Sequence, residues 1–239
     1  PNDDDLNASV RATLEKSSTD NGMIVLGWRD VPVDPEAIGV NARSIMPKIA
    51  QLFVSAPHDV EGDDFERVLY LARKSAEKHL LHIETDTETR KTLLQEFYVC
   101  SWSSRTLIYK GMLLVGQLSK FYLDLKERTM MSAFGIVHSR FSTNTLGSWK
   151  LAHPYRMLAH NGEINTVRGN RNWMQARERS IESPLFGDKI DQLTPICESD
   201  DPSDTASLDN VFELLRMTGR SVEQTAAMLM PAAWYGHES

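Results

Sequence analysis

The sequence has little cysteine and no long apolar run. Its two cysteines, Cys100 and Cys197, are too few and too far apart for a disulfide framework or a CxxC metal site, so we expect two reduced thiols. No apolar stretch approaches the roughly 20 residues that a membrane helix needs, and the acidic start, residues 1–5, lacks the parts of a secretory signal. These absences predict an intracellular chain without a membrane partner.

The features of phosphate and nucleic-acid binding are also missing. Gly162 and Gly169 do not fit a GxGxxG or Walker pattern, which leaves no nucleotide site. The formal net charge is -7, and no run of lysines or arginines has interleaved aromatic residues, so we expect no nucleic-acid partner. Three histidines at positions 138, 153 and 160 have neither an i, i+4 pair nor a nearby cysteine pair, which disfavours a metal site.

What is present is typical of a folded domain. The chain has 239 residues, of which 41% are apolar and 25% charged, and it is long enough to bury a sizeable core. No internal repeat or low-complexity linker interrupts it, so we predict a single domain over residues 1–239.

Periodicity predicts both helices and strands. Apolar residues recur at helical spacing over residues 6–18, 63–81, 164–179, 204–215 and 222–230. Short apolar runs predict strands at residues 23–26, 49–54, 93–102, 106–110, 133–137 and 157–159, with a polar loop at 85–90 and a short helix or irregular segment at 115–125. Because the strands come largely in consecutive pairs flanked by helices, we predict an α+β fold with mostly antiparallel sheets.

Two predicted strand ends carry polar groups suited to one cleft. Arg140 follows the strand at 133–137, and Asn161 and Gly162 follow the one at 157–159. An arginine fork can hold a carboxylate through two parallel hydrogen bonds, and an amide side chain beside a glycine N–H can stabilise an oxyanion.

Each candidate also has a simpler interpretation. Arg140 could form an ordinary structural salt bridge, and Asn161-Gly162 is a strong hairpin-turn signal. Asp204 could cap a helix, accept from a ligand ammonium, or do both. The residues alone leave these alternatives open.

Several longer motifs carry a resemblance to a known family. They are VLGWRDVPV at 25–33, SSRTLIYKGM at 103–112, HSRFSTNT at 138–145, LAHNGEINT at 158–166, GNRNWMQAR at 169–177 and SDTASLDN at 203–210. Together they resemble the amidotransferase domain of the large subunit of glutamate synthase, over about residues 23–234.

The resemblance implies a fold and a reaction. The fold is that of an N-terminal-nucleophile (Ntn) hydrolase, a four-layer αββα sandwich of two mostly antiparallel sheets, here incomplete at its N-terminus. The reaction is that of a class II glutamine amidotransferase, in which an N-terminal cysteine attacks the side-chain amide of L-glutamine, and the released ammonia is transferred to 2-oxoglutarate. Matching by motif, Arg140 would bind the α-carboxylate and Asp204 the α-ammonium, while Asn161 and Gly162 would form the oxyanion hole.

The sequence departs from the family pattern at the nucleophile. Residue 1 is Pro1, and neither Cys100 nor Cys197 has a free α-amino group, so we expect a fragment or a reduced relative that is inactive alone. The alternative is a non-catalytic module that binds glutamine or a partner subunit.

The resemblance also implies partners, cofactors and a location. The partners are L-glutamine, the remaining domains of glutamate synthase, and its small subunit or ferredoxin. FMN and an iron–sulfur cluster belong to the full-length family enzyme, whereas this chain carries no cofactor motif. The expected location is the cytoplasm, or a plastid in a photosynthetic eukaryote.

Overall fold

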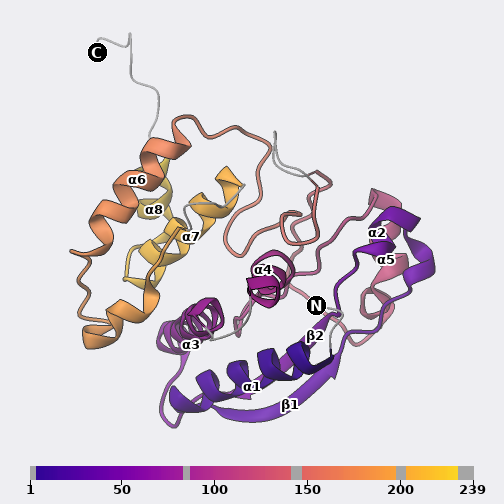
Figure 1. Ribbon diagram of the computed structural model, residues 1–239, viewed down its shortest axis with the longest axis horizontal. Helices are drawn as coiled ribbons and strands as arrows, with labels where there is room; N and C mark the ends of the chain where they lie inside the picture. Colours follow the sequence, from indigo (N-terminus) through magenta and orange to yellow (C-terminus); the bar gives the residue numbers. More distant parts are fainter. Residues whose placement is uncertain (1–3, 83–86, 141–146, 198–202, 231–239) are drawn as a thin grey trace.

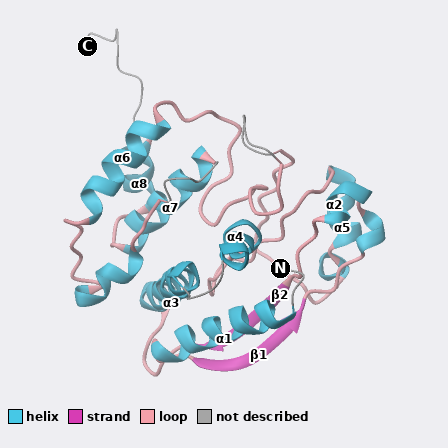
Figure 2. Cartoon of the chain, in the orientation of Figure 1, coloured by secondary structure: helices cyan, strands magenta, loops and turns pink. Residues whose placement is uncertain are grey.

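The computed structural model describes residues 4–82, 87–140, 147–197 and 203–230. Helices dominate these ranges, and two strands form one sheet (Figures 1 and 2). The α-helices are α1 (Asp4–Asp20), α2 (Val40–Ser44), α3 (Gly62–His82), α4 (Thr87–Glu96), α5 (Leu118–Phe121), α6 (Val167–Glu178), α7 (Asp204–Met217) and α8 (Val222–Leu229). The strands are β1 (Ile24–Asp30) and β2 (Ala50–Ser55), and 3-10 turns lie at Pro35–Ala37, Val115–Gln117, Leu123–Lys126 and Gly187–Leu193.

Helix α3 lies between α1 and the C-terminal helices (Figure 1). One of its sides packs against α1, where Val10 and Leu14 meet Ala76 and Leu80. The Ser17 hydroxyl reinforces this contact by donating to the backbone oxygen of Ala72 at 2.6 Å. The helices predicted at residues 6–18 and 63–81 are therefore confirmed, each with a buried apolar stripe.

The strands predicted at residues 23–26 and 49–54 are confirmed as an antiparallel pair, β1 and β2. The register runs from Ile24 opposite Ser55 to Asp30 opposite Ala50, with an irregularity between Val25 and Gly27. Gly27 has a φ of 140°, a conformation that side chains with a Cβ disfavour, so a glycine is needed at this bulge.

The C-terminal helices α6, α7 and α8 gather on the other side of α3 (Figure 1). Tyr70 and Leu71 of α3 pack there against Phe186, Leu193 and Leu214. The helices predicted at residues 164–179, 204–215 and 222–230 are confirmed, and α6 continues through Gly169. Asp204 is not the cap of α7: the N-cap is Ser203, because its side chain accepts the N–H of Ala206, and Asp204 is the first helical residue.

A third group of aromatic residues closes the end that carries α2 and α5. Phe121 and Tyr122 pack there with Trp149, and Phe121 is fully buried. Gly111 lies against the Trp149 ring so closely that a Cβ would come 2.3 Å from Cζ3. Residues 115–125 form short helical turns around this group, as predicted.

The predictions for residues 85–110 were wrong in part. The predicted loop at 85–90 is helical from Thr87, because α4 occupies Thr87–Glu96. The predicted strands at 93–102 and 106–110 are not strands: the first begins inside α4, and the remaining residues are irregular. Leu93 and Glu96 are good helix formers, so intrinsic propensity here outweighed the short apolar pattern.

The strands predicted at 133–137 and 157–159 are also absent, and both segments are irregular. Phe134 and Val137 are each 77% exposed, so the 133–137 run is neither buried nor paired among the described residues. A strand needs a hydrogen-bonded neighbour, and the described residues supply none for this run. The structure therefore supports a mixed helix-and-sheet fold with one two-stranded sheet.

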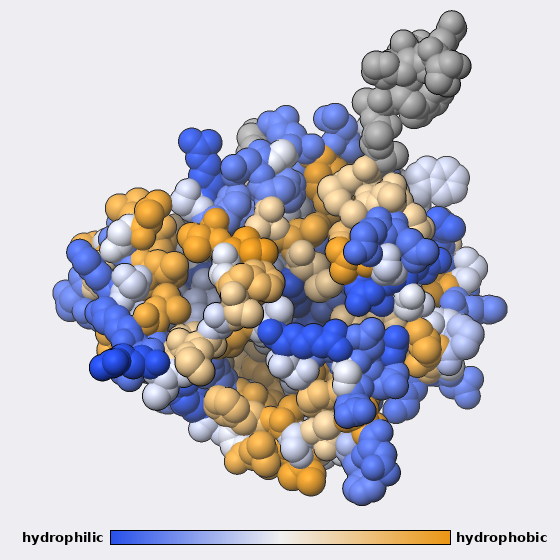
Figure 3. Space-filling model, turned by 180° about the vertical axis from the view of Figure 1, so that it is seen from behind, coloured by the Kyte–Doolittle hydropathy of each residue, from blue (hydrophilic) through white to orange (hydrophobic). Residues whose placement is uncertain are grey.

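A large cleft opens beside the hairpin. It has a volume of about 790 Å³, and α1, both strands and residues 96–110 contribute to its wall, with Trp28, Leu52 and Phe97 among the apolar lining. The face drawn in Figure 3 is hollowed near its middle and carries hydrophobic residues around the hollow. Much apolar surface of this fold is thus left accessible.

Candidate functional site

The four predicted site residues come from three segments that meet at one junction. These segments are residues 138–140, residues 153–164 and the start of α7. Tyr155 joins the second segment to the third, since its hydroxyl lies 3.0 Å from Oγ of Ser203. Residues 141–146, which complete the first motif, lie outside the described residues.

Three histidine rings form the interior of this junction. The ring centroids of His138 and His153 are 4.2 Å apart, and those of His153 and His160 are 5.8 Å apart. Nε2 of His138 donates to the backbone oxygen of His160 at 3.1 Å, while its Nδ1 contacts the backbone of Arg140. The rings therefore hold the Arg140 loop against the segment that contains Asn161.

Gly162 and Asp204 are linked by a continuous chain of hydrogen bonds. The Gly162 N–H donates to Nδ1 of His160 at 3.1 Å, which leaves the ring proton on Nε2. Nε2 then lies 3.1 Å from the Thr205 hydroxyl, and this hydroxyl donates to Oδ1 of Asp204 at 3.2 Å. The predicted oxyanion donor and the predicted ammonium acceptor thus belong to one network.

The carboxylate of Asp204 is half-buried and binds backbone on both sides. Its Oδ2 accepts the N–H of Ile164 at 3.2 Å, and its Oδ1 accepts the N–H of Thr205 at 2.6 Å. Asp204 is the first residue of α7, where the positive end of the helix dipole favours a carboxylate. It therefore fixes the Asn161 segment to the helix start, and further lone pairs remain for a ligand.

Asn161 and Gly162 are exposed on an irregular segment, with no flanking strands. The hairpin interpretation of this Asn-Gly pair is therefore wrong. The Gly162 N–H is already bonded to His160, so it can serve an oxyanion only if this bond opens.

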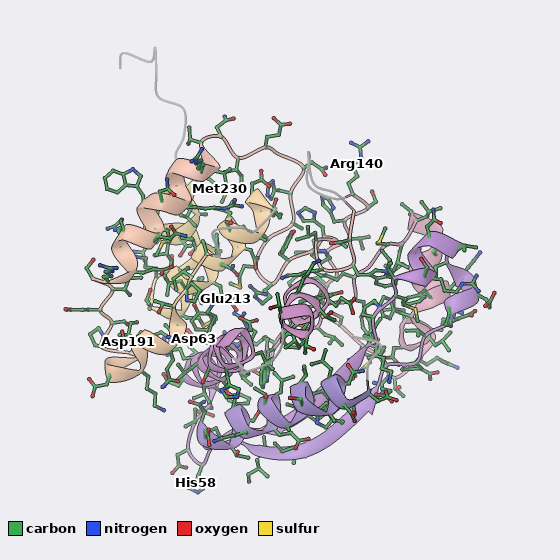
Figure 4. The ribbon with its side chains drawn as sticks, in the orientation of Figure 1. His58, Asp63, Arg140, Asp191, Glu213 and Met230 are labelled. Carbon is green, nitrogen blue, oxygen red and sulfur yellow. The ribbon has the colours of Figure 1, made fainter. Side chains whose placement is uncertain are left out.

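Arg140 extends its side chain away from the body of the molecule (Figure 4). It forms no ion pair with any residue that the structure describes, so nothing there supports the salt-bridge interpretation. Its backbone oxygen accepts from Nδ1 of His153 at 3.2 Å. His153 thus holds the backbone of Arg140, while the guanidinium stays accessible.

His153 is only 5% exposed and remains neutral. Its Nδ1 donates to the backbone oxygen of Arg140, and its Nε2 is buried without a hydrogen-bond partner among the residues that the structure describes. Burial, together with the neighbouring His138 and His160, lowers the pKa of His153 to about 4. A second ring proton would have no acceptor at this position.

The buried carboxylate of Asp209 also supports this junction, although the sequence did not identify it as a site residue. Oδ1 of Asp209 accepts the N–H groups of Met157 and Leu158 at 2.7 and 3.1 Å, and Arg156 lies 3.5 Å from its Oδ2. Burial raises the pKa of Asp209, and Arg156 counteracts this effect. A sequence pattern could have pointed to Asp209, because this charged residue lies on the same face of α7 as Phe212 and Glu213, both of which are buried.

Neither cysteine lies in the network described above. Cys197 is buried and its thiol donates to the backbone oxygen of Ser207, while Cys100 is half-buried and its thiol donates to that of Ile108. Burial raises the pKa of Cys100, which disfavours its reactive thiolate.

The described ranges carry neither a metal-binding cluster nor a membrane-spanning helix. They contain no group of three or more His, Cys, Asp or Glu side chains that could hold a metal ion. In the same ranges, no helix combines the length and the apolar character needed to cross a membrane.

Sequence comparison identifies the family. The sequence model for class-II glutamine amidotransferases matches residues 1–239, so the chain belongs to that family. The chain is 44% identical over 226 residues to the glutamate synthase (NADPH) large chain of Bacillus subtilis, an alignment that covers 94% of this chain. It is 42% identical over 239 residues to the chloroplastic ferredoxin-dependent glutamate synthase of Oryza sativa, covering 99% of this chain.

A cyanobacterial relative gives the same result. Ferredoxin-dependent glutamate synthase 2 of Synechocystis is 43% identical over 226 residues, covering 94% of this chain. In each of these three comparisons the alignment covers 14% of the relative, so the chain spans about one seventh of their length.

Proposed function

We propose that this chain forms the glutamine-binding part of the glutaminase site of a glutamate synthase, which releases ammonia from L-glutamine for transfer to 2-oxoglutarate. The observation that carries the proposal is the junction of residues 138–140, 153–164 and the start of α7, where the hydrogen-bond chain links Gly162 to Asp204. Membership of the class-II family supports the substrate.

In this proposal each predicted residue keeps its role. The accessible guanidinium of Arg140 binds the α-carboxylate of glutamine, and the carboxylate of Asp204 accepts from the α-ammonium. The Asn161 side chain and the Gly162 N–H stabilise the oxyanion, a contribution of about 3 to 4 kcal/mol per donor in such sites. Gly162 can do so only after its N–H leaves Nδ1 of His160, so His160 would hold the free site in a resting state.

The chain by itself is proposed to bind glutamine without hydrolysing it. The family reaction needs a cysteine thiolate beside the glutamine amide. Cys197 is buried, and burial raises the pKa of Cys100, so neither provides that thiolate.

The sandwich fold and the larger assembly belong to the same proposal. The exposed apolar run at 133–137 and the large cleft beside β1 and β2 are consistent with further strands completing a four-layer αββα sandwich. The remaining domains of glutamate synthase, with its small subunit or ferredoxin, are the proposed partners. The iron–sulfur cluster does not fit this chain, because such a cluster typically needs four thiolates and the sequence has two cysteines. We propose that FMN is likewise held by the remaining domains.

Calorimetric titration of the 239-residue chain with L-glutamine tests the proposal. Arg140→Ala and Asp204→Asn should each weaken binding at least about tenfold, because each removes a charge-assisted hydrogen bond. Arg179→Ala, at an exposed arginine after α6, is the matched control and should bind as the parent does. Equal affinity in all three variants would contradict the assigned roles, and ammonia release by the purified chain would contradict the claim that it lacks a nucleophile.

A further inference from the structure

A second, smaller cavity lies beside α3 and has an unusual balance of charge. Its volume is about 130 Å³, and residues of α3, 93–99, 150–156 and 194–196 form its wall. Among the described residues that line it, Glu77 is the only acidic one. The basic lining residues are Lys74, Lys78, Lys110, Lys150 and Arg156.

Lys110 is the most buried of the lysines that line this cavity. Its side chain is 6% exposed, and its Nζ lies over the rings of Tyr98 and Tyr155, at 5.3 and 4.7 Å from their centroids. Ring faces stabilise an ammonium but do not neutralise it. No carboxylate of the described residues forms an ion pair with Lys110, so the ring contacts offset only part of the cost of burying its charge. An anion in the cavity would remove that cost.

The neighbouring cations shape the cavity. Nζ of Lys74 donates to the backbone oxygen of Pro195 at 2.7 Å, and Nζ of Lys78 donates to that of Asp191 at 2.7 Å. Arg156 binds Glu213 through its Nε at 2.9 Å. These groups raise the local positive potential, whereas Lys110 is the group available for direct contact.

The rest of the wall is apolar and limits the size of a ligand. Leu80, Leu93, Phe97, Leu151 and Ile196 line the cavity together with the two tyrosine rings. A cavity of about 150 Å³ admits a guest the size of benzene, so this one admits about six heavy atoms. A ligand that matches both Lys110 and the apolar residues has one anionic group and a short carbon chain.

We propose that this cavity binds a small organic monocarboxylate, with the carboxylate on Nζ of Lys110 and the carbon chain against the apolar wall. The site differs from the proposed glutamine site, because L-glutamine is too large for this volume. Tyr155 connects the two: its ring also lies 5.0 Å from that of His153, in an edge-to-face contact.

Nuclear magnetic resonance titration of the ¹⁵N-labelled chain with sodium butyrate tests this assignment. Amide shifts should map to residues 98–99, 110, 151–153, 155–156, 194 and 196, which surround the cavity. Butyramide has the same shape without the charge and should bind at least about tenfold more weakly, because it cannot form the charge-assisted bond. Shifts that map elsewhere, or equal binding of butyramide, would overturn the proposal.

Two variants and a phosphate titration test whether Lys110 itself binds the carboxylate. Lys110→Met keeps the apolar stem and should abolish the butyrate shifts, whereas Lys120→Met, at an exposed lysine of α5, should leave them unchanged. If Lys110→Met does not fold, the contrast between butyrate and butyramide on the parent chain still decides the question. Inorganic phosphate should bind more weakly than butyrate, and tighter phosphate binding would reject the carboxylate assignment in favour of a general oxyanion site.

Discussion

The histidine rings show how single side chains set up the candidate site. His138 bonds the backbone of His160, and His160 links Gly162 to Thr205 and so to Asp204. His153 lies between the other two rings and stays neutral, because its Nε2 is buried and has no hydrogen-bond partner in the described part of the chain. Protonating that nitrogen would place a charge in a buried position without an acceptor.

Stability should therefore fall as the pH is lowered. The pKa of His153 is about 4 in the folded chain and about 6.5 in an unfolded one, so the unfolded state binds the proton first. Between pH 7 and pH 5 the folded state should lose about 2 kcal/mol through this residue. Urea unfolding at the two pH values should show that loss in the parent and its absence in His153→Gln.

His79→Gln provides the control, because His79 is exposed on α3. This variant should retain the pH dependence of the parent. If His153→Gln retains it as well, the loss at low pH has another source.

Sequence reasoning reached the individual site residues better than their connections. Arg140, Asn161, Gly162 and Asp204 were found because motifs carry them, and their assigned roles stay predictions. The histidines were considered only as metal ligands, although their hydrogen bonds are what join the segments. Such bonds depend on which ring nitrogen meets which backbone group, and sequence spacing does not encode this.

At the scale of elements, the sequence predicted helices better than strands. Helices α1, α3, α7 and α8 satisfy their backbone groups locally and bury one apolar stripe, and both features are visible as periodicity. A strand is completed by a neighbour elsewhere in the chain, so an apolar run alone does not determine it. Residues 24–30 and 50–55 pair with each other, whereas residues 133–137 have no pairing strand among the described residues.

The turn at Gly111 offers a test of the packing around α5. A Cβ on this residue would approach Cζ3 and Cε3 of Trp149 to 2.3 and 2.5 Å, so one of the two must move. Gly111→Ala should lower the free energy of unfolding by about 1 to 3 kcal/mol, the usual cost of overpacking. Urea denaturation measures this change.

Gly116→Ala is the matched control, since a Cβ there would meet nothing within 4 Å. It should leave the free energy of unfolding within about 0.5 kcal/mol of the parent. Equal effects at Gly111 and Gly116 would show that backbone conformation, and not the Trp149 contact, accounts for the loss.

At the scale of the whole molecule, a buried ionic network joins α3 to the candidate site. Arg73 of α3 is 2% exposed and binds Glu77 at 2.8 Å and Glu213 of α7 at 2.5 Å. Glu213 also accepts from Arg156, which lies next to the segment that Asp209 holds. One carboxylate thus connects α3, α7 and the approach to Asn161.

Removing the charge of Glu213 should therefore affect the molecule as a whole. Burial alone would raise the pKa of Glu213, but Arg73 and Arg156 hold it below its usual value, so the group stays ionised in the folded chain. Glu213→Gln leaves two buried guanidinium groups short of one anion and should cost about 3 kcal/mol or more in urea unfolding. Glu182→Gln, at an exposed position outside the helices, should leave the midpoint unchanged. Arg156 positions the backbone before Asn161, so Glu213→Gln should also weaken L-glutamine binding. If the variant is destabilised but binds L-glutamine as the parent does, the network stabilises the fold without shaping the site.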